Sequence, residues 1–191
     1  RMVMAGMEYE KQIPFKDVYF TGMVRDKLGR KMSKSLGNSP DLLDLIDKYG
    51  ADAVRFGIMV SSPAGNDLMF DENSLEQGRN FNNKIWNALK LLKMWALRQA
   101  QDAPTHNSPL TSQDFAIDWF ENRLNKVKVE VDALMKQFRL SEALKTIYSL
   151  IWDDFCSWYL EWIKPGFEQP IDAAVYNKTI GYFEELMQLL H

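Results

Sequence analysis

Two lysines set three residues apart are the residues of this sequence best suited to chemistry. They are Lys31 and Lys34, and they lie in the basic segment RKMSKSLGN at residues 30–38. Lysine carries a compact positive charge, and phosphoryl-transfer sites need such charges at the oxygens where negative charge develops. Gly29 and Gly37 would let the segment close over a nucleotide and reopen. The segment therefore indicates a loop that binds phosphate groups most tightly in a transition state.

Three other interpretations of this segment compete with that one. A P-loop is excluded, because it requires a glycine directly before the Lys-Ser pair and Ser33 stands there instead. A general nucleic-acid or targeting tract stays open, because the cations of this region surround a single acid, Asp26. The cations are Arg25, Lys27, Arg30, Lys31 and Lys34. A solvated loop without a chemical role also stays open.

The rest of the sequence offers few residues for catalysis or metal binding. Cys156 is the only cysteine, and the two histidines, His106 and His191, lie in a polar connector and at the last position. We therefore expect a reducing compartment, no metal site and no catalytic triad built on these residues. The net charge of −3 argues against a generally basic nucleic-acid coat, and no apolar run is long enough to span a bilayer.

The elements that must position the loop are predicted from apolar periodicity and from turn residues. Phe15–Gly22 is rich in β-branched and aromatic residues, which predicts a strand, and Asp26–Gly37 is interpreted as the loop itself. Ser39 as N-cap and Pro40 as the first helical residue predict a helix that ends at Gly50.

Helical patterns occupy the rest of the chain. They cover residues 51–62, Asn73–Arg98, Ser112–Phe138, Ser141–Ile163 and Asp172–Leu190. A polar connector lies at Gln101–Thr111, and a tight turn at Leu140–Ser141 predicts that the helices on either side are antiparallel neighbours. We therefore predict a mainly α protein, with the end of a mixed α/β domain at residues 1–70 and an up-and-down helical bundle at residues 71–191.

The first bundle helix has one apolar face and one polar face. At 100° per residue, the predicted core face consists of Phe81, Ile85, Ala88, Leu89, Leu92, Trp95 and Ala96. The opposite face consists of Arg79, Asn82, Asn83, Trp86, Asn87, Lys90 and Lys93. An aromatic side chain among cations and amides is suited to stacking on bases of single-stranded RNA. The alternative is that Trp86 packs against another part of the protein.

The segment KMSKS at residues 31–35 resembles the signature of the class I aminoacyl-tRNA synthetases. Its surroundings, VYFTGMVRDKLGRKMSKSLGN and YGADAVRFGIMVSS, resemble the end of the catalytic domain in the valine, isoleucine and leucine branch. The stretches GNDLMFDENSLEQGRNFNNKIWNA and WDDFCSWYLEWIKP look like the valine-specific members. The resemblance implies a Rossmann-type catalytic remnant with its ATP loop, followed by an anticodon-binding bundle.

The resemblance also implies roles for the five residues of the signature. Lys34 would act on the phosphates of ATP and Lys31 would assist it. Ser33 and Ser35 would donate hydrogen bonds to the nucleotide or hold the loop, and Met32 would pack as an anchor.

The implied cofactor is ATP with Mg²⁺, bound mainly by upstream parts that this sequence lacks. The implied partners are the tRNA for valine and the catalytic and editing parts of the same chain. The family's second signature, His-aliphatic-Gly-His, does not occur in this sequence. We therefore expect a fragment of a cytoplasmic, monomeric enzyme that is inactive alone and binds no membrane. An isoleucine or leucine enzyme, and a stand-alone RNA-binding helical module, remain as alternatives.

Overall fold

This computed structural model describes residues 1–99, 112–166, 169 and 171–191. The connector predicted at Gln101–Thr111, with His106, lies outside the described residues. In chain order the elements are α1 (Met2–Ala5), the π-helix η1 (Gly6–Glu10), β1 (Val24–Arg25), the 3₁₀ turn η2 (Lys34–Leu36), α2 (Leu42–Tyr49), α3 (Ala51–Val60), β2 (Leu68–Met69), α4 (Glu72–Gln99), α5 (Ser112–Lys136), α6 (Leu140–Ser149), the π-helix η3 (Leu150–Tyr159), α7 (Leu160–Ile163) and α8 (Ala173–Leu190).

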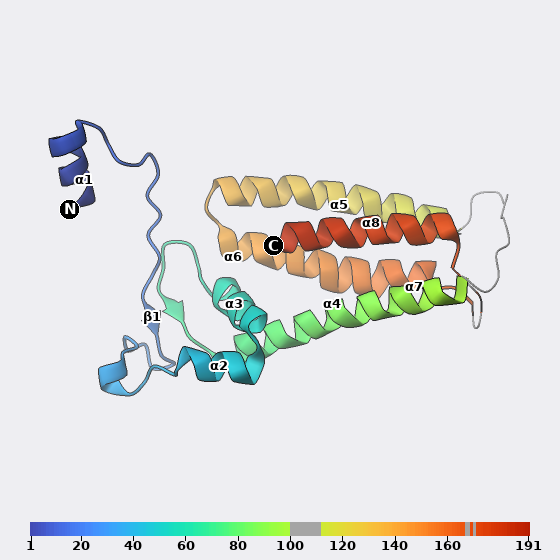
Figure 1. The fold of residues 1–191 in the computed structure, drawn as a ribbon, viewed down its shortest axis with the longest axis horizontal. Coiled ribbons are helices and arrows are strands. Elements are labelled where there is room, and N and C mark those ends of the chain that lie inside the picture. The colour runs from blue at the N-terminus through green and yellow to red at the C-terminus, as the bar shows by residue number, and fades with distance from the viewer. Residues whose placement is uncertain (100–111, 167–168, 170) are drawn as a thin grey trace.

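The long helices form a bundle, which confirms the predicted mainly α fold. Figure 1 shows α5, α8 and the continuous α6–η3–α7 lying alongside one another, with α4 crossing obliquely beneath them. Aromatic side chains fill the centre, where the ring of Phe120 lies 4.8 Å from that of Tyr159 and 5.3 Å from that of Phe155. The hydroxyl groups of Tyr159 and Thr179 are hydrogen-bonded at 2.8 Å inside this core. Phe155 and Tyr159 therefore serve packing, whereas Trp158 and Trp162 of the same segment are exposed.

The third bundle helix departs from the uninterrupted α-helix that its sequence predicts. Its middle ten residues, Leu150–Tyr159, form a π-helix between α6 and α7. Leu150, Phe155 and Leu160 are all buried, and their spacing of five residues matches the i→i+5 hydrogen bonding of a π-helix. Wider turns thus keep three large apolar side chains on one side.

Two glycines allow α3 to pack closely against α4. A Cβ atom added to Gly57 would lie 2.8 Å from the backbone of Ser74, and one added to Gly78 would lie 2.6 Å from the carbonyl oxygen of Ala53. Phe56 of α3 joins the main hydrophobic core of the bundle. Packing is therefore continuous between the residues before and after position 70/71. The domain boundary that the sequence places there stays a prediction.

The strand predicted at Phe15–Gly22 is wrong. These residues form an extended segment that leaves the body of the molecule toward α1 (Figure 1). The strand begins later, as β1, and pairs in parallel with β2 through Val24 and Leu68. Within the described residues, no strand pairs with the predicted segment, so its β-forming composition produces extended backbone without a ladder.

The first predicted helix begins two residues later than Ser39 and Pro40 suggested. Asp41 is the N-cap of α2, and its carboxylate accepts a hydrogen bond from the backbone N–H of Leu43 at 2.8 Å. Asp and Ser are both good caps, and the chain uses the one nearer the apolar residues of the helix. The helix ends at Gly50, as predicted.

Candidate functional site

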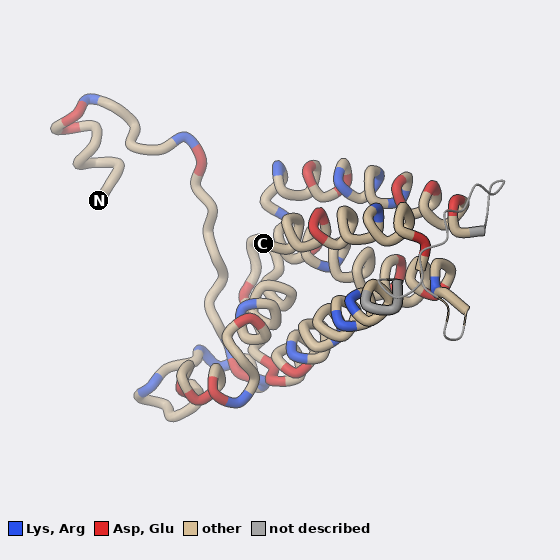
Figure 2. The backbone as a smooth tube through the Cα atoms, turned by 45° about the vertical axis from the view of Figure 1, so that its right-hand side comes forward, with Lys and Arg blue, Asp and Glu red and all other residues tan. Residues whose placement is uncertain are grey.

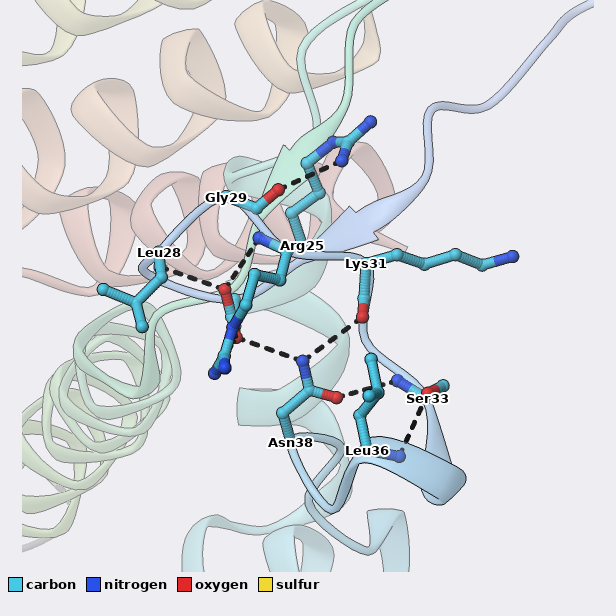
Figure 3. Close-up of polar contacts among 9 residues, drawn as sticks. Arg25, Leu28, Gly29, Lys31, Ser33, Leu36 and Asn38 are labelled. Carbon is cyan, nitrogen blue, oxygen red and sulfur yellow. Dashed lines mark hydrogen bonds and ion pairs between the residues drawn. The ribbon is translucent and has the colours of Figure 1, made fainter.

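The loop after β1 is closed by one carboxylate. Asp26 accepts hydrogen bonds from the backbone N–H groups of Leu28 at 3.0 Å and Arg30 at 2.9 Å. The guanidinium of Arg30 pairs with the same carboxylate at 2.7 Å. Gly29 has φ of +76°, a conformation that suits glycine and turns the chain back (Figure 3). The first part of the loop is thereby fixed around the side chain of Asp26.

The second part of the loop is held by the side-chain amide of Asn38. Its Oδ1 accepts the backbone N–H of Ser33 at 2.9 Å, and its Nδ2 donates to the carbonyl oxygen of Lys31 at 3.2 Å. The same Nδ2 donates to Asp26 Oδ2 at 3.0 Å. Figure 3 shows Asn38 between these partners. One amide therefore joins the two halves of the loop.

These contacts stabilise the charged form of Asp26. The amide of Asn38 above all, followed by Arg30 and the loop N–H groups, holds the pKa of the Asp26 carboxyl well below its ordinary value. Hydrogen bonds donated to a carboxylate favour its ionised state. Asp26 therefore stays an acceptor throughout the neutral range.

The structure divides the cations of the loop into two groups. Arg30 pairs with Asp26, Arg25 pairs with Asp67, and the Nζ of Lys27 lies 3.1 Å from Asp71. In the part of the chain that the structure describes, Lys31 and Lys34 have no carboxylate within 4.0 Å, and both are exposed. Two positive charges thus remain available for a ligand.

Each residue of the KMSKS segment has a definite place. Lys31 forms an isolated bridge with Arg25, and in Figure 3 its side chain extends away from Asn38. Ser33 caps η2 by accepting the N–H of Leu36 at 3.3 Å, and its hydroxyl lies 3.1 Å from that of Ser35. Lys34 is the first residue of η2. The half-buried Met32 lines an open concavity of about 580 Å³ behind the loop.

Asp26 and Asn38 belong to this site, although the sequence predictions did not include them. In the sequence, Asp26 stands out only as the single acid among the cations, although carboxylates at the start of tight turns often bind N–H groups within the turn. Asn38 follows Gly37, whose φ of +65° directs the chain back toward Asp26. The pairing of residues 26 and 38 carries no periodic signal in the sequence.

The polar face predicted on α4 is exposed except at the half-buried Asn82, and Figure 2 shows Lys and Arg spread along this helix. Trp86 is 57% exposed, and the Nζ of Lys90 lies 5.8 Å from the centre of its ring. Arg79 lies 3.7 Å from Glu76 and near the ring of Tyr49. Asn82 and Trp86 line a groove of about 490 Å³ beside α3 and α8. The remaining predicted members, Asn83, Asn87 and Lys93, are also exposed.

Lys84 of α4 lies outside the predicted polar face and contacts η3. Its Nζ lies 4.2 Å above the ring of Trp152 and donates to the hydroxyl of Ser157 at 3.2 Å. Lys84 therefore joins α4 to η3. The predicted core face is buried or half-buried at every position.

Metal-binding clusters and membrane-spanning helices are both absent from the described residues. These residues contain no group of three or more His, Cys, Asp and Glu side chains that could hold a metal ion. None of the helices they form is long and apolar enough to cross a membrane.

Two family models match the chain. The model of the class I tRNA synthetases (I, L, M and V) matches residues 1–71, and the model of the anticodon-binding domain of tRNA ligase matches residues 118–191. The first range contains the KMSKS loop, and the second contains most of the bundle.

Curated relatives match the chain from end to end. The valine--tRNA ligase of Phocaeicola vulgatus is 60% identical over 191 residues, which are 100% of this chain and 21% of that protein. The corresponding ligase of Porphyromonas gingivalis is 57% identical with the same coverage. The ligase of Symbiobacterium thermophilum is 40% identical over 194 residues. This chain spans about a fifth of the length of these relatives.

A solved structure has a similar fold. In the ternary complex LeuRS-tRNA-LeuAMS of Agrobacterium radiobacter, the protein chain aligns with a TM-score of 0.65 over 99% of this chain and 23% of its own length. The sequence identity is 19%, so this likeness concerns the fold.

Proposed function

Because this chain belongs to the class I tRNA synthetases, we propose that it is the part of a valine--tRNA ligase that supplies an ATP loop and an anticodon-binding bundle. The ligase joins valine to ATP with release of pyrophosphate, and then transfers the valyl group to its tRNA. The observation that carries the proposal is the 60% identity to a valine--tRNA ligase over all 191 residues, loop and bundle included.

In the first step, Lys34 and Lys31 neutralise the charge that grows on the departing phosphate oxygens. Both ammonium groups are exposed, and the five-residue segment that carries them is held at Lys31 and Ser33 by Asn38. Positive charge placed before the reaction stabilises a transition state without further reorganisation. Ser33 and Ser35 bind the nucleotide or hold the loop, and Met32 anchors it.

In the second step, the bundle binds the tRNA for valine. The proposed surface is the polar face of α4, with Arg79, Asn82, Asn83, Asn87, Lys90 and Lys93 contacting phosphates and base edges, and Trp86 stacking on a base. Cations attract the RNA backbone, while amides and rings read unpaired bases.

The remaining requirements are met outside this chain. In this proposal Mg²⁺ accompanies ATP and is held mainly by upstream parts of the enzyme. Those parts also supply the valine pocket, the editing domain and the second ATP signature. The enzyme acts as a cytoplasmic monomer, and this chain is inactive alone.

The test is valine-dependent exchange of pyrophosphate into ATP by the full-length protein that contains this chain. We expect exchange with valine, much weaker exchange with isoleucine or leucine, and none with the 191-residue chain alone. Charging of the tRNA for valine, compared with a non-cognate tRNA, tests the second step. Exchange that prefers isoleucine or leucine would refute the valine assignment, and the absence of any exchange would refute the proposal.

A further inference from the structure

Asn38 lies outside the KMSKS segment but binds the backbone of its first and third residues, Lys31 and Ser33. Its amide binds the carbonyl of Lys31 and the N–H of Ser33, which are the backbone groups on either side of Met32. The path of the chain between the two lysines is therefore set by one side chain. Ser33, fixed in this way, caps the 3₁₀ turn that begins with Lys34.

The amide is itself anchored. Its Nδ2 donates to Asp26, and that carboxylate is held by Arg30 and by the N–H groups of Leu28 and Arg30. The chain of contacts runs from Arg30 through Asp26 and Asn38 to the backbone of Lys31 and Ser33. We call Arg30, Asp26 and Asn38 the loop clasp.

Building on the proposed function, we propose that Asn38 is a positioning residue for valyl-adenylate formation, because the loop clasp sets where Lys31 and Lys34 present their charges. Asn38 touches neither ATP nor valine in this role. It acts through the backbone that carries the two lysines. A catalytic charge displaced by about 1 Å from its productive position loses about 100-fold in rate.

The two steps of the reaction depend on the loop clasp to different extents. Only adenylate formation expels pyrophosphate, on whose oxygens the loop lysines are proposed to act, so the loss of the clasp slows that step. Transfer of valine from preformed adenylate to tRNA expels AMP after the pyrophosphate has already left, so it does not depend on those contacts. A general loss of folded enzyme would lower both steps equally.

The experiment uses the full-length enzyme with Asn38→Ala and Asn38→Asp. We expect Asn38→Ala to lower the kcat of valine-dependent pyrophosphate exchange by about 10- to 100-fold, with the single-turnover rate of transfer from preformed adenylate within about twofold of wild type. Asn38→Asp keeps the shape but loses the donor and places a second negative charge beside Asp26, so it should lose at least as much. Asn66→Ala, an exposed asparagine of the same region outside the clasp, is the matched control and should behave as wild type.

A double variant tests whether Asn38 acts through Lys34. If it does, Asn38→Ala combined with Lys34→Ala should be only slightly slower than Lys34→Ala alone, because residues that work as a unit are not additive. Hydrogen exchange at the Ser33 amide should increase in Asn38→Ala, which shows that the clasp has opened.

Three outcomes would overturn the inference. The first is a normal rate of pyrophosphate exchange in an Asn38→Ala enzyme whose Ser33 amide has lost protection. The others are equal losses of rate in adenylate formation and transfer, and a double variant whose loss of rate is the full product of the two single losses. Failure of the proposed function looks different, because the wild-type enzyme would then show no valine-dependent exchange at all.

Discussion

Lys34 is the residue on which the proposed chemistry depends most directly. Its ammonium is exposed and has no carboxylate partner among the described residues. In the full-length enzyme, Lys34→Ala should slow adenylate formation by about 10²–10³-fold, as expected for one preorganised transition-state contact. Ground-state ATP affinity should change much less, and Lys31→Ala should show the same pattern more weakly.

The nearby Lys27 provides the control, because it is engaged with Asp71 at 3.1 Å. Lys27→Ala should leave the rate within a few-fold of wild type. Rapid-quench measurement of adenylate and equilibrium binding of ATP separate the two quantities. A large loss of ATP affinity at an unchanged rate would contradict the transition-state role of Lys34.

Cys156 allows a second residue-level prediction. Burial raises the pKa of its thiol to about 11, although Lys84 nearby opposes the shift. At pH 8 the native thiol should therefore react with an alkylating reagent about 200-fold more slowly than in the unfolded chain, where the ordinary pKa is about 8.5. Mass spectrometry of alkylated protein, with and without denaturant, measures the ratio.

The same pKa fixes how the free energy of unfolding changes with pH. Folding raises the pKa of the Cys156 thiol, so the folded state holds the thiol proton more tightly than the unfolded state. The resulting contribution to stability is complete below about pH 8.5 and is lost as the pH rises through about 11. Equal reactivity of the native and unfolded thiols would show that Cys156 is not buried as described.

At the level of elements, α4 is the helix whose exposed side has a proposed ligand. Reversing charge at Arg79 and Lys90 together should weaken binding of the tRNA for valine and flatten its salt dependence by about two units of slope, about one for each phosphate that is no longer bound. Trp86→Ala should weaken binding by about 1–3 kcal/mol if its ring stacks on a base. Titrations of the full-length enzyme at several salt concentrations measure both effects.

Lys126→Glu is the control for these variants, since Lys126 is exposed on α5 and lies outside the proposed surface. It should leave the salt slope unchanged. Wild-type affinity and slope in the α4 variants, in enzymes that fold normally, would show that the tRNA binds elsewhere.

The accuracy of the sequence predictions differs between elements for physical reasons. The polar and apolar faces of α4 follow from the helical period alone, so Trp86 was placed on the exposed side correctly. The wide turns of η3 leave only a five-residue spacing among many apolar residues, which does not distinguish a π-helix from an α-helix. The predicted strand at Phe15–Gly22 failed because pairing requires a partner strand that local composition does not specify.

The loop also combines features that the local sequence predicts with contacts that it does not. Lys31 and Lys34 were predicted as site residues because the chemistry of a short motif is local, and their role stays a prediction. The contact of Asn38 with Asp26 at 3.0 Å was not predicted, because it depends on the turns at Gly29 and Gly37 acting together. A short motif reveals the charged groups but not the side chains that hold them.

At the level of the whole molecule, the junction between α5 and α6 contacts the N-terminal part of the chain. The ring of Tyr19 stacks on that of Phe138 at 5.7 Å, and the hydroxyl of Ser141 donates to the carbonyl of Val60 at 2.7 Å. Phe138 belongs to this junction, and Ser141 is the second residue of α6. The bundle therefore contacts, through Phe138, the segment that leads into the KMSKS loop.

Phe138 allows a prediction about this junction, because it has φ of +57°, which is unfavourable for a residue with a Cβ atom. Phe138→Gly removes both the strain and the stacking of the rings, whereas Phe138→Ala removes only the stacking. We therefore expect the glycine variant to be about 1 kcal/mol more stable than the alanine variant. Both variants should show less hydrogen-exchange protection near Val24. Thermal unfolding and hydrogen exchange measure the two effects, and equal stability of the variants would exclude backbone strain at this position.

The π-helical turns of η3 have a consequence for how the chain can change in length. Each such turn holds about one residue more than an α-helical turn, so one residue can be deleted between Leu150 and Leu160 while the segment rewinds toward an α-helix. The helices before and after it would keep their orientation. A deletion within the α-helical α4 would instead rotate every later side chain by about 100°. We therefore expect insertions and deletions among related bundles to collect in η3 rather than in α4.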